Sequence, residues 1–474
     1  METTQSWING ESVPSADTYD NVDPATGRTI GLVARAGADE VDRAVAAAAA
    51  AQPAWADTSP EERSELLERW AATVEREAEQ LARWECEDTG KPLSQARADA
   101  RTAARYLRYY AHVVEAFYGI TIPKGADLHA YTRREPFGVV GSVVAWNYPL
   151  QLASRTLAAA AVTGNGIVLK PADETPRTTV ALARYAVEAG LPAGLVNVVT
   201  GIGAEAGAAL TAHEGVSQLS FVGSTTIGSQ IAHAAAERVV PTVLELGGKS
   251  AQVVFADADL EAAAEAVARG VLQNAGQTCS AGSRLLVHAD VHDELVSKVV
   301  QRLEGTTIGP GLDDPDLGPL VSAKQWERVS SFFTDLGQGE VLTGGGRPAD
   351  EALAEGAYFA PTVVDGVDPH SRIAQEEVFG PVLAAMTFTD EDEAVALANS
   401  TEYGLLAALW TRDLSRAHRL AGRVRAGQVF VNNYGAGGGV DLPFGGFGKS
   451  GYGREKGLEA LESFTQTKTV VIKL

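Results

Sequence analysis

A chain of 474 residues is longer than one hydrophobic core usually supports, so two or three domains are expected. With 45% hydrophobic and 21% charged residues, the composition is that of a globular protein and excludes a largely disordered chain. The formal net charge of −22 argues against nucleic acid or an anionic membrane as a partner. An anionic cofactor would also be repelled at long range, so a phosphate site needs local cations and backbone N–H groups.

The two cysteines, Cys86 and Cys279, are too few for a disulfide framework and suit the reducing cytoplasm, where we expect the protein. The first residues show no secretory signal, and no stretch has the pattern of a membrane span. Cys86 falls in a helical region and is expected to pack in the core.

The first quarter of the chain changes from strand to helix. Residues 6–36 alternate short apolar runs with turn sequences and predict small strands. Over residues 38–118 the apolar spacing becomes helical. Ser59, followed by proline and acidic residues, is a typical helix start, and Gly90 is a typical helix end. Residues 121–135 then predict a polar, strand-like segment.

From residue 139 onward, strands and helices alternate. The expected strands are Val139–Ala145, Ile167–Lys170, Leu195–Val199, Gln218–Val222 and Thr242–Leu246, and the expected helices span about 150–163, 176–189, 203–212 and 225–237. A second alternation runs from about 251 to 432, and residues 465–474 return to strand. This order predicts an α/β fold with parallel, doubly wound sheets, in which ligands bind at the carboxyl ends of the strands.

Cys279 lies between a helical pattern, Leu260–Leu272, and a predicted strand, Arg284–His288. The stretch around it is rich in glycine, serine and polar residues, which favours an exposed loop. An exposed thiol that loses its proton is a nucleophile. The alternative is a buried cysteine that packs as a small hydrophobic residue.

Two polar segments follow strands of the first alternation. Asn147 follows the first strand, where its amide could stabilise an oxyanion or cap the next helix. Lys170 and Asp173 close the next strand, and they could hold ribose hydroxyls or form an ion pair.

Two further segments follow later strands of the same alternation. Gly223 and Ser224 lead from a strand into a helix, whose start could receive a pyrophosphate. Glu245 ends the last strand of the alternation, where it could act as a general base or pair with Lys249.

These segments occur in one order that resembles the NAD(P)-dependent aldehyde dehydrogenase superfamily, in its non-acylating form. The matching segments are Trp146-Asn147, Leu169-Lys170-Pro171-Ala172, Phe221-Val222-Gly223-Ser224, Glu245-Leu246-Gly247-Gly248-Lys249, Gly276-Gln277-Thr278-Cys279, Glu377-Val378-Phe379-Gly380-Pro381 and Pro443-Phe444-Gly445-Gly446. The resemblance covers essentially the whole chain.

The resemblance implies three structural parts. They are an NAD-binding, Rossmann-like domain at 1–119 and 137–246, a catalytic domain at 247–445, and a small β oligomerisation element at 120–136 and 446–474. Both larger parts are expected to be doubly wound open sheets. The resemblance also implies a homodimer or homotetramer.

It further implies a role for each residue of the active site. Cys279 would attack the aldehyde, the Asn147 amide would help form the oxyanion hole, and Glu245 would activate water to hydrolyse the thioester. Glu455 matches an acid proposed to relay protons. Lys170 is placed both in the catalytic set and at the adenine ribose.

For the cofactor, the resemblance implies NAD. The expected contacts are Trp146, Lys170, Asp173, Gly223, Ser224, Leu246, Glu377 and Phe379. Asp173 replaces a glutamate that is usual in the family, and its charge should repel a 2′-phosphate, although NADP remains open. No metal is expected.

The substrate would be a small-molecule aldehyde that meets Tyr148 and Arg155. An arginine at this position occurs in enzymes for carboxylate-bearing semialdehydes, where it can bind a carboxylate with two hydrogen bonds. It also occurs in enzymes for aromatic aldehydes, and a plain ion pair is the third interpretation of Arg155.

Two alternative functions remain. A CoA-acylating semialdehyde dehydrogenase would keep the nucleophile but generally lacks the glutamate seen at Glu245. A catalytically idle structural protein on the same scaffold would have lost the thiol or the base, and both Cys279 and Glu245 are present.

Overall fold

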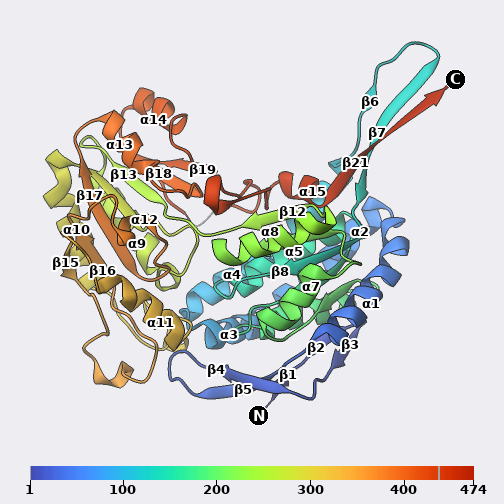
Figure 1. The fold of residues 1–474 in the computed structure, drawn as a ribbon, viewed down its shortest axis with the longest axis horizontal. Coiled ribbons are helices and arrows are strands. Elements are labelled where there is room, and N and C mark those ends of the chain that lie inside the picture. The colour runs from blue at the N-terminus through green and yellow to red at the C-terminus, as the bar shows by residue number, and fades with distance from the viewer. Residues whose placement is uncertain (1, 436–437) are drawn as a thin grey trace.

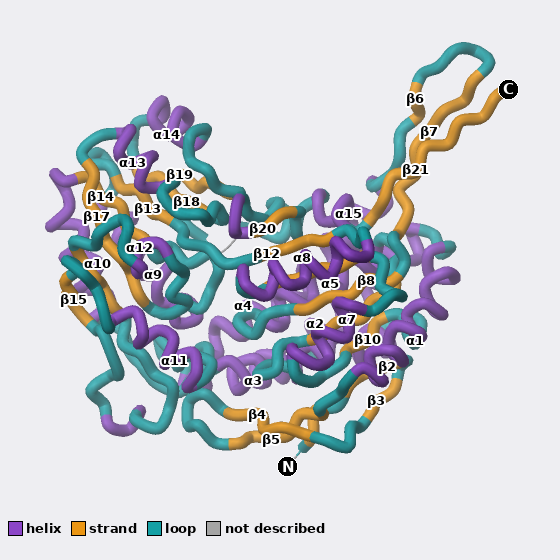
Figure 2. The backbone as a smooth tube through the Cα atoms, viewed as in Figure 1, coloured by secondary structure: helices purple, strands orange, loops and turns teal. Residues whose placement is uncertain are grey.

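The structure is a computed structural model that describes residues 2–435 and 438–474. Two sheet-centred bodies lie side by side, and a narrow β arm projects from one of them (Figures 1 and 2). The C-terminus lies on this arm, and the N-terminus lies at the opposite side of the molecule (Figure 1).

The first body is built on an eight-stranded sheet in the order β20-β12-β11-β8-β9-β10-β2-β3. Its strands are β20 (Gly451–Tyr452), β12 (Thr242–Glu245), β11 (Gln218–Val222), β8 (Val139–Val143), β9 (Gly166–Lys170), β10 (Val196–Val198), β2 (Ser6–Ile8) and β3 (Glu11–Val13). The five central strands are parallel, and antiparallel strands close both edges. All five central strands lie where the sequence predicted them, within one or two residues at each end.

Helices cover both faces of this sheet. They are α1 (Ala38–Ala56), α2 (Pro60–Arg76), α3 (Ala78–Thr89), α4 (Leu93–Val113), α5 (Pro149–Val162), α6 (Arg177–Glu188), α7 (Ala208–Ala212) and α8 (Thr225–Arg238). Helices α1, α7 and α8 share one apolar cluster with the strands, and α2 to α6 share another. Ser59 caps α2, as predicted, and Gly90 ends α3 in a left-handed conformation. Cys86 is buried in the second cluster, also as predicted.

The predicted helix at 203–212 differs from the observed structure. Residues Gly203–Gly207 form a π-helical turn, and only Ala208–Ala212 are α-helical. Two glycines in five residues weaken the α-helix, since glycine loses more backbone entropy than other residues.

The second body is built on a seven-stranded sheet in the order β15-β16-β17-β14-β13-β18-β19. Its strands are β15 (Glu340–Thr343), β16 (Thr362–Asp365), β17 (Val382–Phe388), β14 (Arg284–His288), β13 (Ala251–Val254), β18 (Leu406–Trp410) and β19 (Gln428–Val431). Its helices are α9 (Leu260–Leu272), α10 (His292–Glu304), α11 (Ala323–Ser330), α12 (Arg372–Gln375), α13 (Glu391–Ala398) and α14 (Leu414–Ala421). Apolar clusters lie on both faces, so the prediction of two doubly wound α/β sheets is confirmed.

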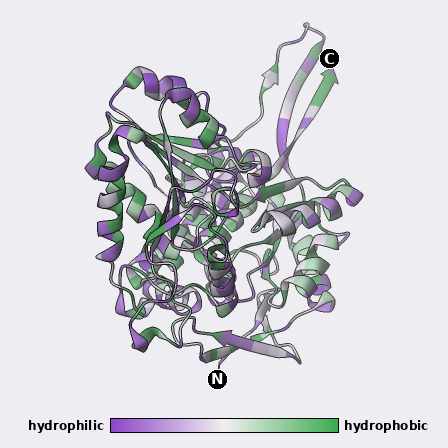
Figure 3. Ribbon diagram, turned by 60° about the vertical axis from the view of Figure 1, so that its left-hand side comes forward, coloured by the Kyte–Doolittle hydropathy of each residue, from purple (hydrophilic) through white to green (hydrophobic). Residues whose placement is uncertain are grey.

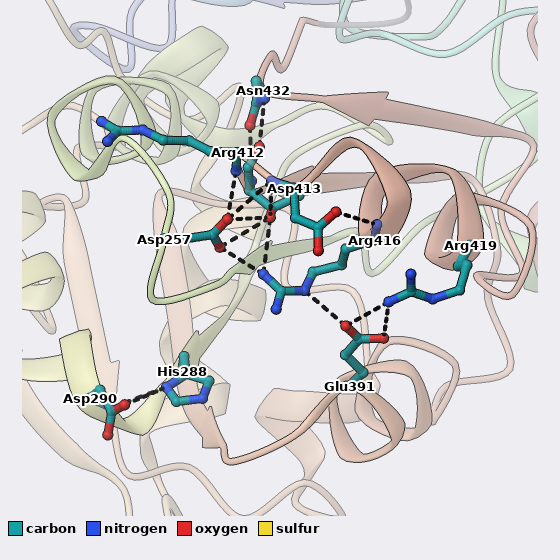
Figure 4. Close-up of polar contacts among 10 residues, drawn as sticks. Asp257, His288, Asp290, Glu391, Arg412, Asp413, Arg416, Arg419 and Asn432 are labelled. Atoms are coloured by element: carbon teal, nitrogen blue, oxygen red, sulfur yellow. Dashed lines mark hydrogen bonds and ion pairs between the residues drawn. The ribbon is translucent and has the colours of Figure 1, made fainter.

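A surface network of charged groups ties α13 and α14 to the end of β13 (Figure 4). The Arg416 guanidinium donates to Asp257 at 2.8 Å and to Glu391 at 2.9 Å. Arg419 also donates to Glu391. The backbone N–H groups of Arg412 and Asp413 donate to Asp257. We call this set the Asp257 network.

The projecting arm is a three-stranded sheet of β6 (Thr121–Ile122), β7 (Leu128–Pro136) and β21 (Thr465–Lys473). Strand β21 pairs with β7 along its whole length, so segments more than 300 residues apart meet here. Helix α15 (Glu459–Ser463) leads into β21. A separate small sheet joins β1 (Thr3–Thr4), β5 (Thr29–Ala34) and β4 (Thr18–Val22).

Within the described residues, no helix combines the length and apolar character needed to cross a membrane.

Candidate active site

A cavity of about 1130 Å³ is lined by residues from both bodies. Most of the predicted site residues line it, namely Trp146, Asn147, Tyr148, Arg155, Gly223, Ser224, Glu245, Leu246, Cys279, Glu377 and Phe379. Three predicted residues, Lys170, Asp173 and Glu455, are not part of this lining. The thiol, the carboxylate and the amide that lie far apart in the sequence therefore share one cavity.

Cys279 lies in the loop between α9 and β14, and its side chain is only partly buried. Three left-handed residues lead into this loop, with φ of 50° at Asn274, 53° at Ala275 and 69° at Gly276. A Cβ atom at Gly276 would lie 2.0 Å from a neighbouring carbonyl oxygen, so only glycine fits. The Gln277 side chain donates back to the Asn274 carbonyl at 3.0 Å, which helps to hold this strained turn.

The surroundings of the Cys279 thiol favour its protonated form. Burial raises the pKa of Cys279 to about 12; the Arg155 guanidinium opposes this shift, and the Glu377 carboxylate adds to it. The thiol therefore carries its proton at neutral pH and needs a base, or a change of surroundings, before it can attack.

Glu245 stands at the end of β12 with 2% of its surface exposed. Within the described chain, neither of its carboxylate oxygens has a hydrogen-bond partner. Burial raises the pKa of Glu245 well above its usual value; the Glu455 carboxylate adds to the shift and Arg155 opposes it. A Cβ atom at Gly445 would lie 2.8 Å from Glu245 Oε1, so glycine leaves room for this carboxylate. A buried carboxyl with a raised pKa is suited to general-base catalysis.

Arg155, on α5, forms a buried ion pair with Glu455. Glu455 also accepts hydrogen bonds from the hydroxyls of Thr156 at 3.3 Å and Ser220 at 3.4 Å. The Arg155 guanidinium therefore has an acidic partner inside the protein, and its Nε has no hydrogen-bond partner within the described chain.

A second cation, Lys456, lies beside this pair. Its Nζ lies 4.7 Å from the centre of the Phe444 ring, and the Arg155 guanidinium lies 5.5 Å from the same ring. Burial lowers the pKa of Lys456 to about 7, and Arg155 adds to that shift. Two cations and two acids, Glu245 and Glu455, thus gather near Cys279.

Asn147 lies two residues before the start of α5 and is 5% exposed. Its Nδ2 donates to the Gln277 carbonyl at 3.0 Å, and its own carbonyl accepts from Asn274 Nδ2 at 2.9 Å. The amide is thereby tied to the loop that carries Cys279. Nδ2 carries two hydrogens, and the bond to the Gln277 carbonyl uses one of them.

The other end of the cavity is aromatic and acidic. The rings of Trp146 and Phe379 meet edge to face, with centroids 5.2 Å apart. Glu377 Oε1 accepts from the backbone N–H of Gly248 at 2.9 Å. Burial raises the pKa of Glu377 to about 7, so this carboxyl is sensitive to what binds beside it.

Ser224 caps α8, and its Oγ accepts from the backbone N–H of Ile227 at 3.4 Å. The cavity reaches this helix start, where unpaired backbone N–H groups can hold a phosphate. Lys170 and Asp173 form an ion pair at the end of β9. Asp173 also accepts from the backbone N–H of Gly203 at 3.1 Å.

The cavity lining also includes residues that were not predicted as site residues, among them Tyr106, Phe444 and Lys456. Phe444 and Lys456 fall in or beside matched segments, so a closer reading could have found them. Tyr106 lies within α4, far from any motif, and its apolar spacing predicts only a core residue.

Comparison with known proteins identifies the class. A model of the aldehyde dehydrogenase family matches residues 7–470. The NADP/NAD-dependent aldehyde dehydrogenase PuuC of Escherichia coli (strain K12) is 42% identical over 477 residues, which cover 99% of this chain and 95% of PuuC. The chain therefore belongs to the aldehyde dehydrogenase family, and the expectation of an aldehyde dehydrogenase is confirmed.

Solved structures agree with this assignment. PnpE from Pseudomonas sp. WBC-3 is 40% identical, with a TM-score of 0.97 over 100% of this chain and 98% of PnpE. A cysteine-to-alanine mutant of the indole-3-acetaldehyde dehydrogenase AldA from P. syringae, solved with NAD+ and IAA, is 40% identical, with a TM-score of 0.96 over 99% of this chain and 96% of AldA.

Proposed function

We propose that this protein oxidises an aldehyde to a carboxylic acid with NAD as the electron acceptor, through a covalent intermediate on Cys279. The observation that carries the proposal is the meeting of Cys279, Glu245 and Asn147 in one cavity. Aldehyde oxidation itself is the activity of the family to which the chain belongs.

In the first step, the Cys279 sulfur attacks the carbonyl carbon and forms a thiohemiacetal. The carbonyl oxygen becomes an oxyanion, which the free N–H of the Asn147 amide and the backbone N–H of Cys279 stabilise. A single donor of this kind contributes about 3 kcal/mol to the stability of the transition state. The thiol proton leaves to solvent as the sulfur attacks, so the Glu245 carboxylate stays available for the later hydrolysis.

In the second step, loss of hydride turns the thiohemiacetal into a thioester. Glu245 then removes a proton from water, and the hydroxide attacks the thioester carbon. The C–S bond breaks to give the acid and a thiolate, which takes the proton back from Glu245. The presence of Glu245 favours hydrolysis over transfer to coenzyme A. Because both Cys279 and Glu245 are present, an active enzyme is favoured over a catalytically idle structural protein.

The cavity and its surroundings suit a dinucleotide. The N-terminus of α8 with Ser224 would hold the pyrophosphate, Lys170 and Asp173 the adenine ribose, and Glu377, Phe379 and Trp146 the nicotinamide end. When bound, the nicotinamide supplies the acceptor for the hydride. PuuC is described as using NADP or NAD, and AldA was solved with NAD+. The Asp173 charge opposes a 2′-phosphate, so we propose NAD as the preferred cofactor.

For the substrate, we propose an aldehyde with an aromatic tail. Tyr106, Tyr148 and Phe444 line the cavity, and Arg155 is paired with Glu455. A carboxylate-bearing semialdehyde is the second candidate, since the cations Arg155 and Lys456 also line the cavity. The change Arg155→Ala separates the two. If Arg155 binds a carboxylate tail, oxidation of succinate semialdehyde falls much more than that of benzaldehyde; equal losses mean that Arg155 only positions Glu455.

The arm fits a role in assembly, and we propose a homodimer or homotetramer. Val471 and Ile472 on β21 are 58% and 43% exposed, and Figure 3 shows the end of this strand as hydrophobic. Exposed apolar strands are typical of surfaces that pair with another chain. Ile472→Glu combined with Val471→Lys should lower the mass measured by light scattering. An unchanged mass would mean that these residues of the arm do not contribute to the interface.

The activity is tested by an aldehyde panel with NAD and NADP, read by the absorbance of the reduced cofactor. We expect NADH and free acid, and higher kcat/KM with NAD than with NADP. Turnover that requires added coenzyme A and gives an acyl-CoA in place of the free acid would contradict the proposal. No cofactor reduction with any aldehyde would also contradict it.

A further inference from the structure

A buried charged cluster borders the cavity, and one of its members, Asp99, lines it. Lys91, in the turn between α3 and α4, has no exposed side-chain surface. Its Nζ donates to Glu85 Oε1 at 2.9 Å and to Asp99 Oδ2 at 2.6 Å, and it lies 4.3 Å from the centre of the Tyr148 ring. We call Lys91, Glu85 and Asp99 the Lys91 cluster.

Each acid of the Lys91 cluster holds one residue at the start of α5. Glu85 Oε2 accepts from the backbone N–H of Leu150 at 3.2 Å. Asp99 Oδ1 accepts from the Gln151 side chain at 2.6 Å. Lys91 joins the two acids, so three elements meet at the first turn of α5.

The sequence of α5 explains why this support is needed. Helix starts leave backbone N–H groups without partners, and a side chain just before the helix usually accepts one of them. Helix α5 has Tyr148 at this position, whose side chain makes no such hydrogen bond. Pro149 has no N–H, so the Leu150 N–H is the first that needs a partner, and Glu85 supplies it from another helix.

Buried charges such as those of the Lys91 cluster stabilise a core less efficiently than apolar side chains do. Removing three charges from water costs several kcal/mol per ion, and a well-packed apolar replacement is often as stable. Burial raises the pKa of Glu85 to about 7, and Lys91 opposes the shift. Charged hydrogen bonds, however, fix direction better than apolar contacts, and Asn147 is joined to this turn through Tyr148 alone.

We propose that Lys91 is a positioning residue which, through Glu85 and Asp99, fixes the first turn of α5 and thereby aims the Asn147 amide at the substrate oxygen. This inference rests on the proposed role of Asn147 as the oxyanion donor. Gln95, one turn before Asp99 on α4, holds the loop that carries Cys279, because its Oε1 accepts from the backbone N–H of Asn274 at 2.9 Å. Displacing a catalytic group by about 1 Å can lower a rate about a hundred-fold.

The test is a double-mutant cycle of Lys91→Met and Asn147→Ala, read by single-turnover reduction of NAD with a small aldehyde such as acetaldehyde. We expect Lys91→Met to lower the single-turnover rate of NAD reduction about ten- to a hundred-fold in the otherwise native enzyme. In the Asn147→Ala background it should have less than a two-fold effect, and the Kd for NAD should not change. Lys298→Met, which removes a surface lysine paired with Glu261, is the matched control and should have no effect.

Equal losses in both backgrounds, or a changed Kd for NAD, would overturn the inference and leave Lys91 as a stabilising residue only. If Asn147→Ala itself does not slow hydride release, the proposed oxyanion role fails, and the inference fails with it. If Lys91→Met does not fold, Gln151→Leu replaces it, because that change removes the hydrogen bond between Gln151 and Asp99 and keeps all three charges of the Lys91 cluster. The same non-additive pattern is expected, and additive losses would again overturn the inference.

Discussion

Two networks in this protein pair basic with acidic side chains in opposite surroundings. The side chains of the Lys91 cluster are at most 5% exposed. In the Asp257 network, Arg416, Asp257, Glu391 and Arg419 keep between 24% and 54% of their side-chain surface exposed (Figure 4). Water and salt screen the exposed charges, so each surface pair contributes about 0–1 kcal/mol. The buried charges cannot lose one partner without leaving another uncompensated. The cluster behind the active site should therefore be far less tolerant of change.

The largest expected effect on stability comes from Lys91→Met. It leaves Glu85 and Asp99 buried without a cation, which should lower the free energy of unfolding by about 3–5 kcal/mol. Urea-induced unfolding followed by circular dichroism measures this change. A loss below about 1 kcal/mol would mean that the buried and exposed networks do not differ as described.

The buried Arg155–Glu455 pair should behave in the same way and also affect catalysis. Arg155→Met removes the cation that opposes the raised pKa of Glu245, so this pKa should rise further. The rising limb of kcat against pH should then move to higher pH, because Glu245 must be ionised to activate water. An unchanged rising limb would show that Arg155 does not affect the pKa of Glu245.

The reactivity of Cys279 gives a third, smaller effect that reports on the surroundings of the thiol. In the enzyme without cofactor, the pKa of Cys279 is raised to about 12, mainly by burial. The rate of iodoacetamide labelling should therefore rise about ten-fold per pH unit from pH 7 to 9, because only the thiolate reacts. A plateau below pH 8 would show a much lower pKa. Cys279→Ala controls for labelling elsewhere, since Cys86 is buried.

The smallest effect is expected in the Asp257 network. Arg419→Ala removes one exposed partner of Glu391 while Arg416 remains. The free energy of unfolding should fall by less than about 1 kcal/mol, and the difference should shrink in 1 M salt. A loss comparable to that of Lys91→Met would contradict the comparison.

The sequence predicted the parts of the molecule that local patterns determine. The strand that leads to Asn147 and the strands that end in Lys170 and Glu245 follow from short apolar runs. The loop at Cys279 follows from its glycines and flanking elements. The order of motifs then identified the family. These features are visible because strand ends in a parallel sheet gather at one edge.

Contacts across the fold could not be predicted in this way. The pairing of Arg155 with Glu455, 300 positions later, depends on how α5 and the segment before α15 pack together. Lys91 likewise appears only as a residue after a helix-ending glycine, and its link to the start of α5 emerges from three elements that pack together. Burial decides the charge state of such groups, and single-residue patterns do not encode burial.

The central claim, a covalent intermediate on Cys279 that Glu245 resolves, is tested most directly by intact-protein mass spectrometry of Glu245→Gln. After mixing with benzaldehyde and NAD and rapid acid quenching, we predict a stoichiometric acyl adduct that peptide mapping places on Cys279. Cys279→Ala should show none. A Glu245→Gln enzyme that turns over at the native rate without an adduct would contradict the account.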